Sequence, residues 1–163
     1  MKRKIDPFEY AGEICKALPA GILLTTKRGE EVNTMTIGWG GLGTLWRKPV
    51  CTVYVKPCRY THSFMEANDY FTVSFFDDEY RGALSVLGTK SGRDGDKVSE
   101  VGFTPVAAGE SITFKEAKIT LLCKKIYRQD LTLDAMPSDA IEKYYTEEAP
   151  HTMFIGEVVD IIE

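Results

Sequence analysis

Extended segments rich in β-branched and aromatic residues dominate this chain, and several follow one another across short turns. Residues 21–26 and 32–39 are separated only by the charged residues 27–31, which predicts a β-hairpin. Further strands are expected at residues 49–55, 70–76, 118–127 and 151–162, with Pro49 at a strand start, where proline is tolerated. This pattern favours an antiparallel barrel over the regular strand–helix alternation of a doubly wound sheet.

The expected helices are short and lie between the strands. Apolar residues at helical spacing predict one at residues 8–18, which Pro19 ends. Others are expected at residues 61–68, 78–87 and 138–145, the last with Ser138 as N-cap. Residues 88–102 are expected to form a polar, glycine-rich loop with about one helical turn. The length suits a single domain over residues 1–163.

Composition excludes several classes of protein. The net charge of −4 does not favour a nucleic-acid or anionic-membrane binder. No apolar run approaches the roughly 20 residues of a membrane span, and the basic residues 1–7 lead into no apolar segment, so no secretory signal is expected. The four cysteines, Cys15, Cys51, Cys58 and Cys123, have no C-x-x-C spacing and are expected to be reduced core thiols of a cytoplasmic protein.

Residues 36–46, TIGWGGLGTLW, contain the pattern G-x-G-x-x-G. In dinucleotide-binding proteins this pattern follows a strand and opens a helix, whose N-terminus holds the pyrophosphate. Here Pro49 would stop a helix within about two turns. The alternative is a strand edge and loop in which another group approaches the glycine backbone closely.

Residues 56–66, KPCRYTHSFME, predict an anion site. Ser63-x-x-Glu66 has the spacing of a capping box, which predicts a helix start near Ser63. A helix N-terminus offers N–H groups and a positive dipole end to an anion, and Arg59, Thr61 and Ser63 add a guanidinium and two hydroxyls. The alternative is a capped surface helix beside a solvated arginine.

A second polar cluster spans residues 91–97, SGRDGDK. It lacks the G-K-[ST] ending of a P-loop, so nucleoside triphosphate binding is not indicated. By itself the cluster is more typical of a flexible solvated loop than of a phosphate site.

The two histidines leave alternatives open. His62 either contacts the anion or is exposed, and it pairs with Cys58 as nucleophile and base only if another group orients the pair. Cys51, Cys58, His62 and His151 match no ordinary zinc spacing, so no metal is expected.

Five stretches, in order, resemble the flavin reductase-like FMN-binding split-barrel family, in particular its flavoredoxin-like branch. They are NTMTIGW at 33–39, RYTH at 59–62, YFTVS at 70–74, SGRD at 91–94 with Lys97, and HTMFIGEV at 151–158. The resemblance covers nearly the whole chain. It implies a six-stranded antiparallel Greek-key split barrel with flanking helices, and a homodimer with two FMN sites near the subunit interface.

The resemblance also implies site roles. The strand containing Asn33, Thr34, Met35 and Thr36 would run beside the isoalloxazine ring and supply N–H groups and a hydroxyl, with Trp39 as a flavin neighbour. The phosphate and ribityl chain would be held by Arg59, Tyr60, Thr61 and Ser63. Lys97, with Ser91 and Arg93, would close over the phosphate, from the same or the partner subunit. His151 would lie near the exposed flavin face, where a nicotinamide stacks.

The expected function is therefore that of an FMN-dependent oxidoreductase. Hydride would pass from NAD(P)H to the flavin and electrons onward to an acceptor, with preorganised N–H donors stabilising negative charge on the reduced ring. No protein nucleophile is required. Two alternatives are an electron carrier of the flavoredoxin type, reduced by a redox protein partner, and a non-redox flavin-binding protein.

Overall fold

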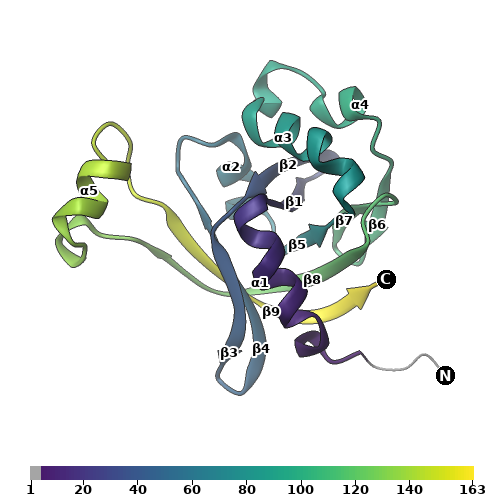
Figure 1. Ribbon diagram of the computed structural model, residues 1–163, viewed down its shortest axis with the longest axis horizontal. Coiled ribbons are helices and arrows are strands. Elements are labelled where there is room, and N and C mark those ends of the chain that lie inside the picture. The colour runs from purple at the N-terminus through teal and green to yellow at the C-terminus, as the bar shows by residue number, and fades with distance from the viewer. Residues whose placement is uncertain (1–4) are drawn as a thin grey trace.

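A computed structural model describes residues 5–163, and its main feature is one antiparallel sheet of seven strands (Figure 1). The strand order is β2-β1-β5-β8-β9-β4-β3. The strands are β1 (Ile22–Arg28), β2 (Glu31–Ile37), β3 (Gly40–Leu45), β4 (Lys48–Val55), β5 (Tyr70–Phe75), β8 (Ile119–Asp130) and β9 (Thr152–Ile162). A separate hairpin pairs β6 (Pro105–Ala108) with β7 (Ser111–Phe114). Residues 1–4, part of the predicted basic N-terminal segment, lie outside the described residues.

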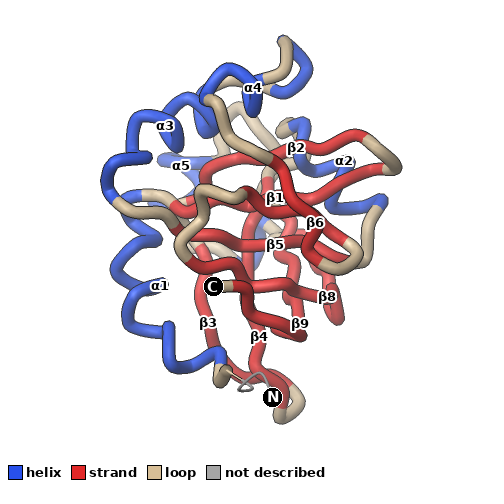
Figure 2. The backbone as a smooth tube through the Cα atoms, turned by 90° about the vertical axis from the view of Figure 1, so that its right-hand side faces the viewer, coloured by secondary structure: helices blue, strands red, loops and turns tan. Residues whose placement is uncertain are grey.

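The sheet is bent rather than flat. Figure 2 shows β3 and β4 running across the direction of β1 and β5. The long pair β8–β9 shifts register between Leu122 and Cys123 and between Lys125 and Tyr127, and such bulges increase twist and bend. The predicted mainly β, antiparallel class with flanking helices is confirmed. The predicted six strands are replaced by seven in this sheet.

The extra strand is β3, and it is built from the glycine-rich motif. A tight turn at Trp46 and Arg47, with φ of 50° and 60°, joins β3 to β4 as a primed hairpin turn. At Gly40, φ is +156°, and a Cβ there would lie 2.5 Å from the carbonyl oxygen of Thr52. The motif is therefore a strand at the sheet edge whose backbone meets β4 closely, and the dinucleotide interpretation is excluded because a strand, not a helix, follows.

Five α-helices surround the sheet in the described part of the chain: α1 (Ala11–Ala17), α2 (Tyr60–Ala67), α3 (Arg81–Thr89), α4 (Lys97–Val101) and α5 (Ser138–Tyr144). Short 3-10 helices precede α1 and α3, follow α1, and occur at Gly92–Asp94 and Leu133–Ala135. The segment at 88–102 is thus more ordered than the predicted loop, because Asp96 accepts a hydrogen bond from the N–H of Ser99 and caps α4. None of the helices within residues 5–163 combines the length and apolarity needed to cross a membrane.

The predicted helices at 61–68 and 138–145 begin within one residue of α2 and α5, but the N-cap roles predicted for Ser63 and Ser138 are wrong. The turn at Lys56–Arg59 leads the chain into α2 three residues before Ser63, so Ser63 lies inside the helix, and its Oγ donates to the carbonyl of Tyr60 at 3.1 Å. The capping box therefore does not form. Ser138 is the first helical residue rather than the N-cap, because the extended Pro137 occupies that position.

The cysteines divide into two pairs. Cys51 and Cys123 are buried thiols in the sheet, as predicted. Cys15 and Cys58 are exposed, which corrects their assignment to the core: Cys15 lies on the solvent face of α1, and Cys58 lies in the turn before α2.

Two apolar cores position the functional region. The larger lies between the bent sheet and α1, where Ile14 and Leu18 pack on sheet residues. The smaller joins β1 to α3 and α4 and comprises Leu23, Leu84, Leu87, Val98, Phe103 and Phe114. Together with Phe64 and Met65 of α2, this packing brings the start of α2, the end of α3 and the start of α4 beside β2. In contrast, α5 lies on an arm that leaves the body between β8 and β9 (Figure 1).

The glycine at position 156 offers a test of the core. A Cβ at Gly156 would lie 2.7 Å from the Cβ of Cys123 and from the ring of Phe71, both fully buried. Because overpacking a filled core forces strain, we predict that Gly156→Ala lowers the free energy of unfolding by about 1–3 kcal/mol in chemical denaturation. In the control Gly41→Ala, a Cβ meets no atom within 4 Å, so the change is expected within about 0.5 kcal/mol. Equal stability of both variants would contradict this packing.

Candidate functional site: two adjoining pockets beside an edge strand

Two pockets adjoin along β2. The smaller, of about 190 Å³, lies between β2, the start of α2 and the segment from the end of α3 to Lys97; we call it the anion pocket. The larger, of about 350 Å³, lies between the end of β2, the end of β4 and the base of the arm; we call it the ring pocket. Met35, Cys58 and Arg59 line both, so the two form one continuous site.

The C-terminus of α3 holds the cations of the anion pocket in place. Lys97, only 5% exposed, donates from Nζ to the carbonyls of Leu87 and Lys90, each at 2.9 Å. Arg59 donates to the carbonyl of Gly88, also at 2.9 Å. Carbonyls at a helix C-terminus lack partners within the helix and carry the negative end of its dipole, so they suit cationic donors.

The positive charge in this pocket is not neutralised. Arg93 donates to the carbonyl of Cys58 at 3.1 Å, so it too is bonded to a neutral acceptor. Within residues 5–163, no carboxylate forms an ion pair with Arg59, Arg93 or Lys97, and no Asp or Glu lines the anion pocket. Lys90 also lines it and pairs with Glu100. Burial and then the charge of Arg59 lower the pKa of Lys97 to about 8.

The start of α2 adds uncharged donors. Arg59 is the N-cap residue and no side chain caps the helix; the N–H of His62 donates to the carbonyl of Arg59, so the N–H groups of Tyr60 and Thr61 are the ones available to an anion. Tyr60 and Thr61 line the pocket at this end. Asn33 donates from Nδ2 to the Thr61 hydroxyl at 2.9 Å and thereby ties β2 to α2.

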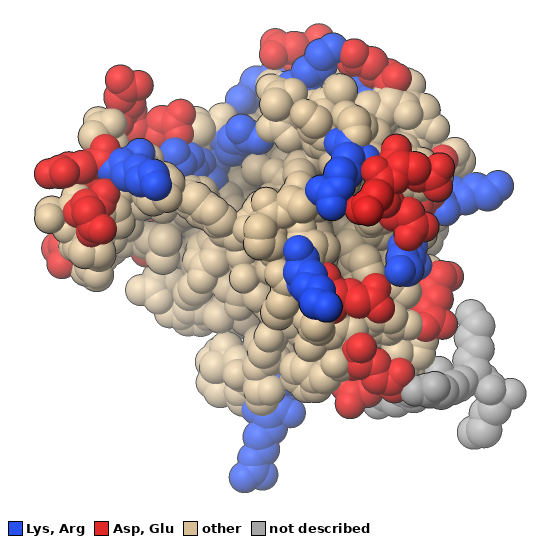
Figure 3. Space-filling model, in the orientation of Figure 1, with Lys and Arg blue, Asp and Glu red and all other residues tan. Residues whose placement is uncertain are grey.

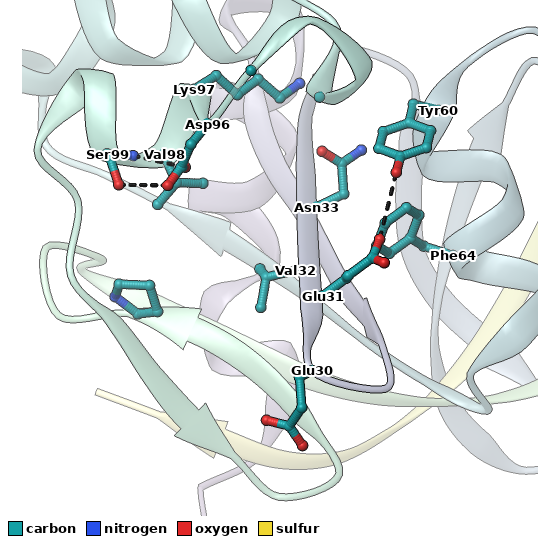
Figure 4. A pocket seen from close by; sticks show the side chains of 13 residues that line it. Glu30, Glu31, Val32, Asn33, Tyr60, Phe64, Asp96, Lys97, Val98 and Ser99 are labelled. Atoms are coloured by element: carbon teal, nitrogen blue, oxygen red, sulfur yellow. Dashed lines mark hydrogen bonds between the residues drawn. The ribbon is translucent and has the colours of Figure 1, made fainter.

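Asn33, Tyr60, Gly92 and Lys97 form a narrow wall between the anion pocket and a further pocket, and they line both. A Cβ at Gly92 would lie 2.2 Å from Oδ1 of Asn33 and 2.9 Å from the Tyr60 ring. Beyond the wall lies a further pocket of about 360 Å³, whose lining includes Glu30, Glu31 and Asp96, with the Tyr60 hydroxyl 3.5 Å from Glu31 (Figure 4). An anion in the anion pocket would therefore have a narrow wall on this side, with carboxylates behind it.

The ring pocket combines an edge strand with aromatic side chains. Because β2 is the terminal strand of the sheet, its outward backbone groups face no other strand. Trp39, 47% exposed, lies with its ring centroid 5.1 Å from those of His151 and Tyr144. Lys56 anchors the arm here by donating to the carbonyl of Tyr144 and by pairing with Glu148 at 2.7 Å.

His151 lines the ring pocket in a neutral state. Its Nδ1 lies 2.7 Å from the Tyr145 hydroxyl. Burial, followed by the positive charge of Lys56, lowers the pKa of His151 to about 4, so the imidazole is uncharged near neutral pH.

All predicted site residues except Thr34 and Ser63 line one of the two pockets. The Thr34 side chain is fully buried and bonds to Thr25 and the carbonyl of Leu24, so only its backbone faces the edge. Ser63 is exposed and accepts a hydrogen bond from Arg28. Thr36 reaches the ring pocket, but its hydroxyl donates to the carbonyl of Leu84.

The remaining predicted site residues come together in this one chain, so the cluster needs no second subunit to form. They are Asn33, Met35, Trp39, Arg59, Tyr60, Thr61, Ser91, Arg93, Lys97 and His151.

His62 has a different place from the pocket residues. Its Nε2 lies 2.9 Å from the Thr152 hydroxyl and joins α2 to β9. It therefore faces away from Cys58, and the two form no nucleophile–base pair. Over residues 5–163 the structure contains no cluster of three or more His, Cys, Asp or Glu side chains arranged to hold a metal ion.

Sequence reasoning did not identify Lys56, Lys90, Gly92, Tyr145 and Glu148 as site residues. Lys56 and Glu148 meet only because the arm folds back over the end of β4. A signal for Tyr145 was present in the aromatic doublet Tyr144-Tyr145 within an otherwise acidic segment shortly before His151. Acidic side chains do gather on this arm (Figure 3).

Comparison with known proteins gives a family and a fold. A family model described as a flavin reductase like domain matches residues 16–163. Among curated proteins, none matches the sequence significantly.

Three solved structures are similar in fold. Flavoredoxin of Desulfovibrio vulgaris (Miyazaki F) has a TM-score of 0.69 and 23% identity over 87% of this chain and 68% of its own. An FMN-binding protein from Thermus thermophilus with bound 1-cyclohex-2-enone has a TM-score of 0.69 and 20% identity, over 88% of this chain and 69% of its own. Nitrilotriacetate monooxygenase component B from Bacillus cereus has a TM-score of 0.67 and 15% identity, over 99% of this chain and 81% of its own. The predicted family and fold class are confirmed.

Lys97 gives this site a characteristic pH dependence of stability. Its pKa is about 8 in the folded chain and 10.5 ordinarily, so the unfolded chain binds the proton more tightly. The charged lysine therefore lowers stability below pH 8, and this cost disappears as the pH rises towards 10.5. We predict that the wild type gains stability relative to Lys97→Met over this range, measured by denaturation at several pH values. The control is Lys115→Met, at an exposed position. A difference that does not change with pH would contradict the buried ammonium.

Proposed function

The chain belongs to the flavin reductase-like domain family, and on that premise we propose that it is an FMN-binding oxidoreductase that takes hydride from NAD(P)H and passes electrons to an acceptor. One observation carries this proposal: a pocket with three cations bonded only to backbone carbonyls opens into an aromatic pocket beside an edge strand.

The anion pocket suits a phosphate monoester. A dianion requires several donors and compensating charge, and Arg59, Arg93 and Lys97 supply both next to the start of α2. Because these cations are already held by carbonyls, they need little reorganisation when an anion binds. A bound phosphate would also favour the charged form of Lys97 and so offset the cost of burying its ammonium.

The narrow wall at Gly92 favours a mononucleotide. A dinucleotide would have to continue past its first phosphate, where Asn33, Tyr60 and Gly92 are in contact and carboxylates lie beyond. A second phosphate is repelled by those carboxylates. This supports FMN over a flavin dinucleotide.

The ring pocket suits a flat heteroaromatic ring with a polar edge. Because N–H groups alternate in direction along a strand, one of the neighbours Met35 and Thr36 in β2 points its N–H outward, and this group would serve as a fixed donor for that edge and stabilise negative charge. When bound, FMN supplies the hydride acceptor and electron store, which no side chain of this chain can replace. Trp39 and the neutral His151 would offer an uncharged stacking surface to a nicotinamide.

The flavoredoxin-like fold supports an alternative in which a redox protein reduces the flavin. The predicted homodimer and cytoplasmic location stay predictions.

The purified protein provides the direct test of the redox function. We expect it to bind FMN and to bleach in the visible spectrum when NADH or NADPH is added under anaerobic conditions. Bleaching only with a reduced ferredoxin-type protein would favour the electron carrier. A bound flavin that neither donor reduces would contradict a redox function.

The role of the anion pocket is tested by Arg59→Ala. Because a hydrogen bond to a charged group contributes about 1.5–3 kcal/mol, we predict roughly a 10- to 100-fold loss of FMN affinity, measured by flavin fluorescence titration. Riboflavin, which lacks the phosphate, should bind the variant about as well as the wild type. Arg81→Ala, an exposed arginine at the start of α3, is the control. An equal loss for both ligands would place Arg59 outside the phosphate site.

A further inference from the structure

His151 and Tyr145 form a hydrogen-bonded pair beside the ring pocket. The Tyr145 hydroxyl lies 2.7 Å from Nδ1 of His151, and the two rings meet edge to face with centroids 5.6 Å apart. Tyr145 directly follows the last residue of α5, and His151 directly precedes β9. The N–H of Leu131 donates to the carbonyl of His151 at 3.0 Å, which fixes the histidine at the base of the arm.

The surroundings determine which atom carries each proton. Within residues 5–163 the Tyr145 hydroxyl has one hydrogen-bond partner, Nδ1 of His151, so this nitrogen is the acceptor available to the tyrosine proton. A neutral imidazole has one N–H, and if Nδ1 accepts from tyrosine the ring proton must sit on Nε2. Burial raises the pKa of Tyr145, so its hydroxyl stays protonated near neutral pH.

Burial, and after it the positively charged neighbours, lower the pKa of His151 and keep its imidazole neutral. Lys56, with Nζ 5.5 Å from the centre of the Tyr145 ring, and Arg59 both disfavour the imidazolium. Glu148 opposes them, but it is already paired with Lys56 at 2.7 Å. The titratable groups that face the pair from the end of β4, the start of α2 and the arm are therefore Tyr54, Lys56, Arg59, Tyr144 and Glu148.

We propose that Tyr145 is a positioning residue that holds His151 in the Nε2–H tautomer, so that the ring pocket is lined by a neutral N–H donor. Trp39, packed against His151, restricts rotation of the imidazole and keeps this arrangement. The donor suits an acceptor without charge, such as the carbonyl oxygen of a carboxamide next to the flat ring. The role of this N–H donor rests on the proposed function. The tautomer of His151 does not, because it is a property of the chain itself.

Nitrogen-15 NMR of the imidazoles tests this directly, because the chain contains only two histidines. His62→Gln assigns the two sets of signals. We expect His151 of the wild type near neutral pH, with and without FMN, to show a protonated Nε2 and an unprotonated Nδ1. Tyr145→Phe should produce a mixture of both tautomers. Tyr144→Phe, which removes the hydroxyl of the neighbouring tyrosine, should leave the signals unchanged. A protonated Nδ1 in the wild type, or unchanged signals in Tyr145→Phe, would overturn the proposal.

Kinetics separate positioning from a structural role. In Tyr145→Phe we expect kcat for flavin reduction by NAD(P)H to fall about tenfold, with FMN affinity and melting temperature close to those of the wild type. A parallel loss of FMN affinity and kcat would instead mean that Tyr145 only supports the fold of the arm, which overturns the proposal. If the flavin is not reduced by NAD(P)H although Nε2 carries the proton, the proposed function fails while the assignment of the tautomer stands.

Discussion

Two cations that meet the C-terminal carbonyls of α3 organise the functional region. Lys97 from α4 and Arg59 from the start of α2 each bond to this one helix end, and so bring three segments to β2. The last carbonyls of a helix need hydrogen-bond donors, and a buried ammonium needs acceptors, so a hydrogen bond between the two satisfies both. Because the acceptors are neutral carbonyls, the charge of both cations stays available. The contacts that hold these segments together therefore also create the anion pocket.

The pocket contrasts with the charge of the whole chain. The net charge is −4, and acidic side chains gather on the arm (Figure 3). The recess next to β2 nevertheless has no carboxylate in its lining. Because charges separated by more than about 10 Å are largely screened at ordinary ionic strength, a local positive pocket coexists with a negative surface. Net charge therefore predicts the class of macromolecular partner and not the small ligand.

Local patterns in the sequence predicted most of the fold, since alternating and β-branched segments mark strands wherever their side chains pack. They did not count β3 as a strand of its own, although the strand-edge alternative for the glycine motif, with a close backbone approach, agrees with the position of β3 beside β4. The supposed capping box at Ser63 failed because the turn before Tyr60 started α2 earlier. Arg59 and Lys97 were found from motifs and resemblance. Lys56 and Tyr145 were missed because their contacts with Glu148 and His151 depend on how the arm folds back.

The chain's two tryptophans occupy sharply different environments. Trp39 packs on His151 at the ring pocket, whereas Trp46 is 62% exposed in the turn between β3 and β4. Any chromophore that enters the ring pocket lies next to one indole and leaves the other in solvent. The fluorescence of Trp39 should therefore respond when a chromophore binds in the ring pocket. The fluorescence of Trp46 should not respond and can serve as an internal reference.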